Sequence, residues 1–172
     1  LHGKRNHIAR FKDSGDWSYE PMTAENVEEC RTMTYTWIHM REEKWNEEMN
    51  QEISVLHEAF DHMQELGLVG GVLRRDGQIV AFSIGERLNS ETFVVHFEKA
   101  YPDLQGAYPM INQQFVLHEC EGYAYVNREE DTGDPGLRKA KLSYYPDILL
   151  PKYELEESRV VYADPERDAP YI

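Results

Sequence analysis

The sequence predicts a single mixed α/β domain. Its 172 residues are enough for one domain with a hydrophobic core and too few for two comfortable ones. Apolar residues recur at helical spacing up to about residue 67 and alternate like strands after it. The pair Asp76 and Gly77 lies between two apolar runs, which is the strongest short-range signal of a β-hairpin.

The first third of the chain is predicted to be mostly helical. Residues 1–11 form a short basic helix, turn residues occupy 13–16, and 17–20 alternate like a short strand. One helix begins after Thr23, and a second ends at Gly67, where a left-handed cap is expected. The inward-facing residues are expected to be Val27, Cys30, Thr34 and Trp37 in the first helix and Ile53, Leu56, Phe60 and Met63 in the second.

Three strands follow and are expected to form an antiparallel meander. Residues 70–74 and 79–85 pair through the Asp-Gly turn, and 92–99 add the third strand. Strict alternation would divide the side chains of the third strand between two faces. One face then carries Phe93, Val95 and Phe97, and the other carries Val94, His96 and Glu98.

Helices and strands alternate in the remainder of the predicted order. A helix covers about 106–121, a buried strand 123–126, a second helix about 137–144, and a last strand about 149–154. Residues 160–162 extend that strand or pair with it. The polar tail beyond them is expected to be frayed.

Composition limits the classes of function. The formal net charge is −14, so the surface as a whole repels nucleic acids and anionic membranes. Cys30 and Cys120 are far apart and lack metal-like spacing, which favours a reducing compartment. No apolar run is long enough for a membrane helix, and no signal-peptide pattern opens the chain. We expect a cytoplasmic protein without stable membrane insertion.

Motifs for several common chemistries are missing from the sequence. No set of His, Cys and carboxylate residues has convincing metal-ligand spacing, so no metal is expected. There is neither a Gly-x-Ser-x-Gly elbow nor a Walker loop. The sequence therefore gives no support to a hydrolase or an NTPase.

Polar and charged residues cluster directly after the 123–126 strand. Asn127, Arg128 and Glu129 are expected at its carboxyl end, where ligands bind in open α/β sheets. Arg138 and Lys139 follow in a basic run that could bind a phosphate or carboxylate group of a small-molecule or aminoacyl substrate. Because acids and bases are nearly balanced in this segment, an internal ion-pair network is an equally good interpretation.

The third meander strand carries two candidate acid–base residues. A carboxylate at Glu98 beside an imidazole at His96 could accept a proton from an amine nucleophile. The alternative is a surface or hydrogen-bonded structural role for both side chains.

The order and lengths of these elements resemble the GNAT (acyl-CoA N-acyltransferase) fold, a mixed and mostly antiparallel sheet flanked by helices. In that fold the helix after the meander receives the pyrophosphate of the cofactor. The resemblance implies that Gln105, Gly106 and Ala107 form the phosphate cradle, since unpaired N–H groups at a helix start attract anions. A simple helix start with Pro109 in its first turn is the alternative.

Longer sequence matches carry a more specific resemblance. They are residues 4–11 (KRNHIARF), 66–71 (LGLVGG), 93–99 (FVVHFEK), and 126–131 (VNREED) with 136–144 (GLRKAKLSY). These segments resemble a largely uncharacterised bacterial family that is similar to the C-terminal domain of phosphatidylglycerol lysyltransferase. The resemblance runs from the first residues to about Tyr153.

This resemblance implies a tandem arrangement of GNAT-like domains. Residues 1–14 would be a basic linker helix from a preceding domain that is missing here, 15–163 the GNAT-like domain, and 164–172 a flexible tail. The better-known relatives move an aminoacyl group from aminoacyl-tRNA to a lipid headgroup, and the wider fold moves acyl groups from acyl-CoA to amines. The resemblance therefore implies acyl-CoA or aminoacyl-tRNA as alternative donors. Direct tRNA binding by residues 4–12 is a third option, which requires these residues to form one continuous face because the net charge opposes it.

The leading hypothesis is an acyl- or aminoacyl-transferase domain that presents an activated carbonyl to an amine or hydroxyl in a V-shaped cleft. Glu98 would serve as the base. Tyr144 lies near the position where GNAT enzymes often carry a tyrosine that protonates the leaving thiolate, although packing against the sheet explains it equally well. The competing hypothesis is a non-catalytic ligand-binding or interaction domain that retains this scaffold.

Overall fold

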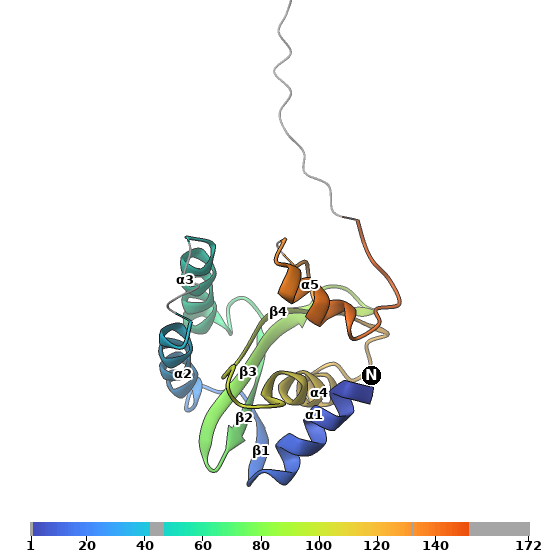
Figure 1. The fold of residues 1–172 in the computed structure, drawn as a ribbon. Helices are drawn as coiled ribbons and strands as arrows, with labels where there is room; N and C mark the ends of the chain where they lie inside the picture. Colours follow the sequence, from blue (N-terminus) through green and yellow to red (C-terminus); the bar gives the residue numbers. More distant parts are fainter. Residues whose placement is uncertain (1, 42–46, 132, 152–172) are drawn as a thin grey trace, which may run out of the picture.

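A five-stranded sheet forms the centre of the domain, with helices on both of its faces (Figure 1). The computed structural model describes residues 2–41, 47–131 and 133–151. Strands β1 to β4 are antiparallel neighbours, and β5 runs parallel to β4. The prediction of a mixed, mostly antiparallel sheet is therefore confirmed. The strands are β1 (Trp17–Pro21), β2 (Val69–Arg75), β3 (Gln78–Arg87), β4 (Thr92–Ala100) and β5 (Tyr125–Asn127).

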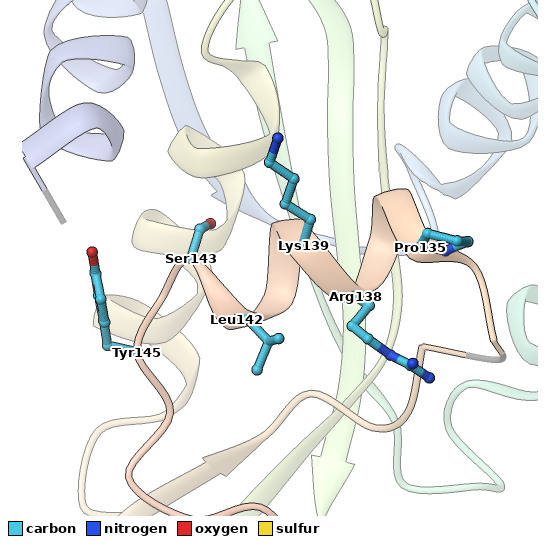
Figure 2. Close-up of a pocket in the computed structure, with 6 residues that line it drawn as sticks. All are labelled: Pro135, Arg138, Lys139, Leu142, Ser143 and Tyr145. Carbon is cyan, nitrogen blue, oxygen red and sulfur yellow. The ribbon is translucent and has the colours of Figure 1, made fainter.

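The helices divide between the two faces of the sheet (Figure 1). Helices α2 (Val27–His39) and α3 (Glu47–His62) cover one face, and α1 (His2–Asp13) and α4 (Ala107–Glu119) cover the other. Helix α5 (Pro135–Leu142) lies at the periphery, and none of its residues is buried. Figure 2 shows that basic side chains extend from different sides of α5.

Two turns follow directly from their residue types. Asp76 and Gly77 have φ values of 50° and 80°, in the left-handed region, and join Arg75 to its partner Gln78 in a two-residue hairpin. Gly67 adopts the predicted left-handed conformation, with φ of 66°. The hairpin prediction is confirmed, whereas α3 ends at His62 rather than at Gly67.

The sheet separates two parts of the hydrophobic core. The cluster on the α2 and α3 face includes Cys30, Trp37, Leu56, Phe60 and Phe82. The cluster on the α1 and α4 face includes Phe11, Leu73, Ala81, Met110 and Ile111. Phe11 is completely buried and thus packs α1 into the domain. The assignment of residues 1–14 as a linker from a preceding domain stays a prediction.

A bulge in β4 interrupts the predicted alternation. Ile84 of β3 pairs with Phe97, but the next residue, Gly85, pairs with Val95. His96 is therefore the additional residue that has no partner in this register. Residues of β4 on either side of the bulge therefore do not follow one alternating pattern. Phe97 and Glu98 face the sides of the sheet opposite to those that strict alternation predicts from Phe93 and Val95.

The reversal corrects the predicted faces of β4. Phe93 and Val95 pack against α4, whereas Phe97 belongs to the cluster under α2 and α3. Glu98 accordingly contacts α4. The prediction that Phe97 shares a face with Phe93 was wrong, because strict alternation assumes an unbroken ladder.

The last predicted elements differ from the structure in part. β5 is three residues long, and Tyr125 is 49% exposed, so the predicted buried strand is an exposed edge strand. Residues 149–151 are not in a strand. The rest of that predicted strand and all predictions for 160–172 lie outside the described residues.

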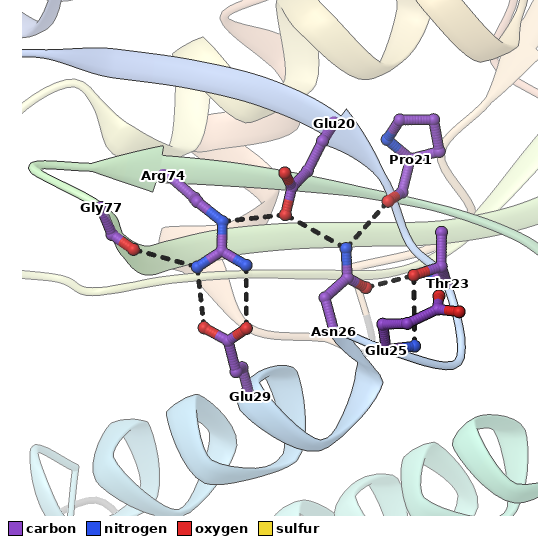
Figure 3. A network of polar contacts seen from close by, with 8 residues as sticks. All are labelled: Glu20, Pro21, Thr23, Glu25, Asn26, Glu29, Arg74 and Gly77. Atoms are coloured by element: carbon purple, nitrogen blue, oxygen red, sulfur yellow. Dashed lines mark hydrogen bonds and ion pairs between the residues drawn. The ribbon is translucent and has the colours of Figure 1, made fainter.

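Arg74 of β2 fixes the start of α2 against the sheet (Figure 3). Its guanidinium donates to both carboxylate oxygens of Glu29, at 2.7 and 2.9 Å, and to Glu20 Oε1 at 2.8 Å. Asn26, directly before α2, donates to the same Glu20 oxygen at 3.1 Å. The network joins β1, β2 and α2 through side chains with several partners each.

Candidate functional site

Strands β4 and β5 run side by side for three residue pairs and then separate. Their last pair is Val94 with Asn127. β4 continues to Ala100, while the chain after β5 turns away through Glu129, whose φ is 56°. Arg128 directly follows this last pair. Ligand contacts are predicted at this end of β5, because ligands bind at the carboxyl ends of strands in open α/β sheets.

An ion pair spans the separation between the two strands. Arg128 Nη2 donates to Glu98 Oε1 at 2.9 Å, and Asn112 Nδ2 of α4 donates to Glu98 Oε2 at 3.1 Å. The side chains of Glu98 and Arg128 are 13% and 22% exposed. Glu98 is thus held by two donors from different elements in a largely dehydrated position.

Tyr144 lies beside this ion pair. The guanidinium carbon of Arg128 is 4.6 Å from the centre of the Tyr144 ring, and Lys4 Nζ of α1 is 4.5 Å from it. Burial, and then the negative charge of Glu98, raise the pKa of Tyr144 to about 12. The Tyr144 hydroxyl therefore keeps its proton at neutral pH and is able to donate it.

Two lysines add positive charge around Glu98. Lys141 Nζ donates to the main-chain oxygen of Arg128 at 2.7 Å and to that of Glu130. Burial, and then the charge of Arg128, lower the pKa of Lys4 and of Lys141. We name this group the Glu98 cluster; it consists of Lys4, Glu98, Asn112, Arg128, Lys141 and Tyr144.

His96 belongs to a different set of contacts. Its ring nitrogens lie 2.9 Å from Glu86 Oε1 and 2.8 Å from Glu129 Oε1. Partial burial opposes protonation, but the two carboxylates outweigh it, so the pKa of His96 is raised. The expected acid–base pair of His96 and Glu98 on one face is therefore not formed. His96 instead connects β3 and β4 to the loop after β5.

The other predicted substrate-binding residues are engaged within their own segment. Asn127 Oδ1 accepts a hydrogen bond from Glu129 N at 2.8 Å, which stabilises the turn after β5. Arg138 donates to both oxygens of Asp131, at 2.6 and 2.9 Å, and lowers the pKa of that carboxyl to about 2. This part of the segment agrees with the ion-pair interpretation. Lys139 is exposed on α5.

A shallow pocket of about 510 Å³ lies on the outer side of α5 (Figure 2). Arg138 and Lys139 extend in different directions from this helix, so they do not converge on one point. The lining residues are Pro135, Arg138, Lys139, Leu142, Ser143 and Tyr145. The pocket does not include a member of the Glu98 cluster.

The predicted phosphate cradle lies under α1. Gly106 has φ of 87°, and a Cβ added there would lie 2.3 Å from His7 O. Ala107 is completely buried, and its N–H donates to Leu104 O at 3.1 Å. Packing against α1 is sufficient to require glycine here. A phosphate-binding role for Gln105, Gly106 and Ala107 stays a prediction.

Asn112 was not among the predicted site residues, and Lys4 was predicted solely as part of a basic segment. Asn112 is 8% exposed and lies beside Ile111 on the buried face of α4. A polar residue next to this apolar face was a usable signal, since buried amides require partners. The contact of Lys4 with Tyr144 joins segments that are far apart in the sequence, and local patterns do not reveal such contacts.

In residues 2–41, 47–131 and 133–151, no three or more His, Cys, Asp or Glu side chains are grouped so that they could hold a metal ion. Within the same part of the chain, no helix combines the length and apolar character needed to cross a membrane.

The family model described as "Phosphatidylglycerol lysyltransferase, C-terminal" matches residues 1–156. The chain belongs to this family. The resemblance inferred from the sequence is therefore confirmed. A curated relative, an uncharacterised protein from Mycoplasmoides gallisepticum, is 23% identical over 158 residues, which are 89% of this chain and 49% of the relative.

Two solved structures are similar to this chain. A conserved protein of unknown function from Bacteroides thetaiotaomicron is 44% identical, with a TM-score of 0.82 over 86% of this chain and 50% of its own. A ribosomal-protein-alanine N-acetyltransferase from Brucella melitensis is 13% identical, with a TM-score of 0.57 over 82% and 99%. The second likeness shows the GNAT fold alone. The chain spans about half the length of the curated relative and of the Bacteroides protein.

Proposed function

We propose that this chain is an acyl- or aminoacyl-transferase domain and that the Glu98 cluster is its site. The observation that carries the proposal is the gathering of Glu98, Arg128 and Tyr144 where β4 and β5 separate. Membership of the lysyltransferase family and the GNAT fold support transfer of an activated acyl group. The donor would be acyl-CoA or aminoacyl-tRNA, and the acceptor an amine or hydroxyl group.

Each proposed role follows from a property of the side chain. Arg128 orients the substrate through its guanidinium, which the Glu98 carboxylate holds in place. Glu98 accepts the proton that the amine or hydroxyl loses when it attacks the carbonyl. Tyr144 gives its proton to the departing thiolate or ribose oxygen, since its pKa of about 12 keeps it protonated. The new acyl bond forms as the old ester or thioester bond breaks.

The surrounding contacts would keep Arg128 in position. Lys141 binds its main-chain oxygen, and His96 binds the next residue, Glu129. Both contacts hold the backbone on the C-terminal side of Arg128. In this proposal His96 is a positioning residue that acts through Glu129.

Donor binding by the full-length protein tests the proposal. Acetyl-CoA and lysyl-tRNA should each be titrated, and at least one should bind saturably. Arg128→Ala should weaken that binding, whereas Arg87→Ala, which removes an exposed arginine at the end of β3, should not. Absence of saturable binding for every donor in a panel of acyl-CoA and aminoacyl-tRNA species would contradict the proposal.

A non-catalytic ligand-binding domain is the second candidate. It is favoured by the ion pair that fills the separation of β4 and β5 and by the packing of Gly106 against α1. This alternative predicts donor binding that depends on Arg128 without consumption of donor when protein is in excess. Transfer to any acceptor would exclude it.

A further inference from the structure

Unused hydrogen-bonding capacity lies next to Glu98. In the described part of the chain, Arg128 Nε and Nη1 are buried and have no hydrogen-bond partner. An arginine has five N–H donors, and these two nitrogens carry three of them. A buried polar atom without a partner costs about 1–3 kcal/mol, so such atoms usually meet a ligand or an ordered water.

Ser83 adds a third atom of this kind. It lies directly opposite Glu98 in the pairing of β3 with β4, so both side chains share the face covered by α4. Its hydroxyl is buried and has no partner among the described residues. Hydrogen-bonding groups on two neighbours of Glu98 are therefore available to an additional polar group.

The charge balance indicates the sign of that group. Lys4, Arg128 and Lys141 bring three cations to one carboxylate, Glu98, in a chain whose net charge is −14. Glu129 and Asp131 also act on Lys141, but each already pairs with another side chain, Glu129 with His96 and Asp131 with Arg138. The lowered pKa values of Lys4 and Lys141, due to burial and then to Arg128, agree with an excess of positive charge.

A small pocket shares one residue, Lys4, with the Glu98 cluster. It has a volume of about 260 Å³, lies between α1 and the end of α5 and is lined by Gly3, Lys4, His7, Ser143 and Tyr145. Tyr144 lies between two of the lining residues in sequence.

We infer that Arg128 and Lys4 bind an oxyanion, a carboxylate or phosphate group of the ligand, which enters between α1 and α5. The guanidinium donors left free by Glu98 would provide charge-assisted hydrogen bonds. The ammonium of Lys4 would provide the second charge. The inference rests on the proposed function in one respect: it names the chemical class of ligand for the same site.

Calorimetric titration of the full-length protein with inorganic phosphate, and separately with acetate, tests the inference. Ionic strength is held constant with NaCl, so that general screening does not change. We expect saturable binding of at least one anion, weakened at least about tenfold by Arg128→Lys, which keeps the charge and loses the guanidinium donors. Arg87→Ala should bind as the wild type does. Binding of phosphate would identify the oxyanion of the ligand as a phosphate group, and binding of acetate would identify it as a carboxylate.

Lys4→Met provides an independent variant, because it keeps the apolar stem and removes a charge on a different helix. It should also weaken binding. Two results would overturn the inference: no saturable heat with either anion, or wild-type affinity in both Arg128→Lys and Lys4→Met. Either result would mean that ordered water satisfies Arg128 Nε and Nη1. No turnover is involved, so anion binding without transfer contradicts only the proposed function, and transfer without anion binding contradicts only the inference.

Discussion

The carboxylate of Glu98 and the guanidinium of Arg128 lie 2.9 Å apart, joining β4 to the segment that follows β5. Since these strands are paired for just three residues, this contact is one of the links that hold the end of β5 to the sheet. The same ion pair positions the guanidinium that we propose for substrate binding. Its loss should therefore affect both stability and function.

Arg128→Ala should lower the free energy of unfolding by about 2 kcal/mol, because it leaves a largely buried carboxylate without its cation. Urea denaturation measures the change. Arg87→Ala is the matched control and should change stability by less than about 0.5 kcal/mol. Equal effects of the two substitutions would contradict a structural role for the ion pair.

His96 should make stability depend on pH. Its pKa is raised in the folded state above the ordinary value of 6.5, so its contribution is fully present below about pH 6.5 and is lost as pH rises through the folded-state pKa. His96→Gln should therefore lower stability by about 1 kcal/mol at pH 6 and by less at pH 9. Urea denaturation across this range measures both proteins. If the difference in unfolding free energy between the wild type and His96→Gln grew with pH, the raised pKa of His96 in the folded state would be contradicted.

Gly106→Ala should disturb the contact between α1 and α4. Its Cβ would lie 2.3 Å from His7 O, in addition to the strain of a φ of 87°. Gly122→Ala is the matched control, since its φ is 89° and nothing lies within 4 Å of the added atom. Denaturation should show Gly106→Ala to be less stable than Gly122→Ala by about 2 kcal/mol. Equal stability would contradict the close packing of α1.

Tyr144→Phe should separate proton donation from packing. The ring remains beside Arg128, but the proton that we propose for the leaving group is lost, so the rate of transfer should fall by about 10²-fold or more. Donor affinity and stability should change little. Tyr125→Phe, at a position 49% exposed on β5, should retain the wild-type rate. A wild-type rate for Tyr144→Phe would exclude its role as the acid.

Local patterns predicted the fold well where the interactions are local. The Asp76-Gly77 hairpin and the turn at Gly67 depend on backbone preferences of a few residues, and both are present. The buried faces of α2 and α3 follow from helical spacing. Strict alternation failed at His96, because a bulge is set by pairing with β3 rather than by the β4 sequence alone.

The candidate site was predictable in part. The end of β5 pointed to Arg128, and the family resemblance to Tyr144. The contacts that give these residues their chemistry come from elements distant in sequence, namely Lys4 in α1 and Asn112 in α4. The need for glycine at 106 likewise depends on α1, which packs across the start of α4.

The most direct test of the account is a single-turnover measurement with the full-length protein in excess over labelled acetyl-CoA or lysyl-tRNA. Primary amines and phosphatidylglycerol vesicles serve as acceptors. We predict transfer of label from at least one donor, slowed at least about tenfold by Arg128→Lys and unchanged by Arg87→Ala. Donors that stay intact with every acceptor, or a transfer rate that Arg128→Lys leaves unchanged, would contradict the proposed role of the Glu98 cluster.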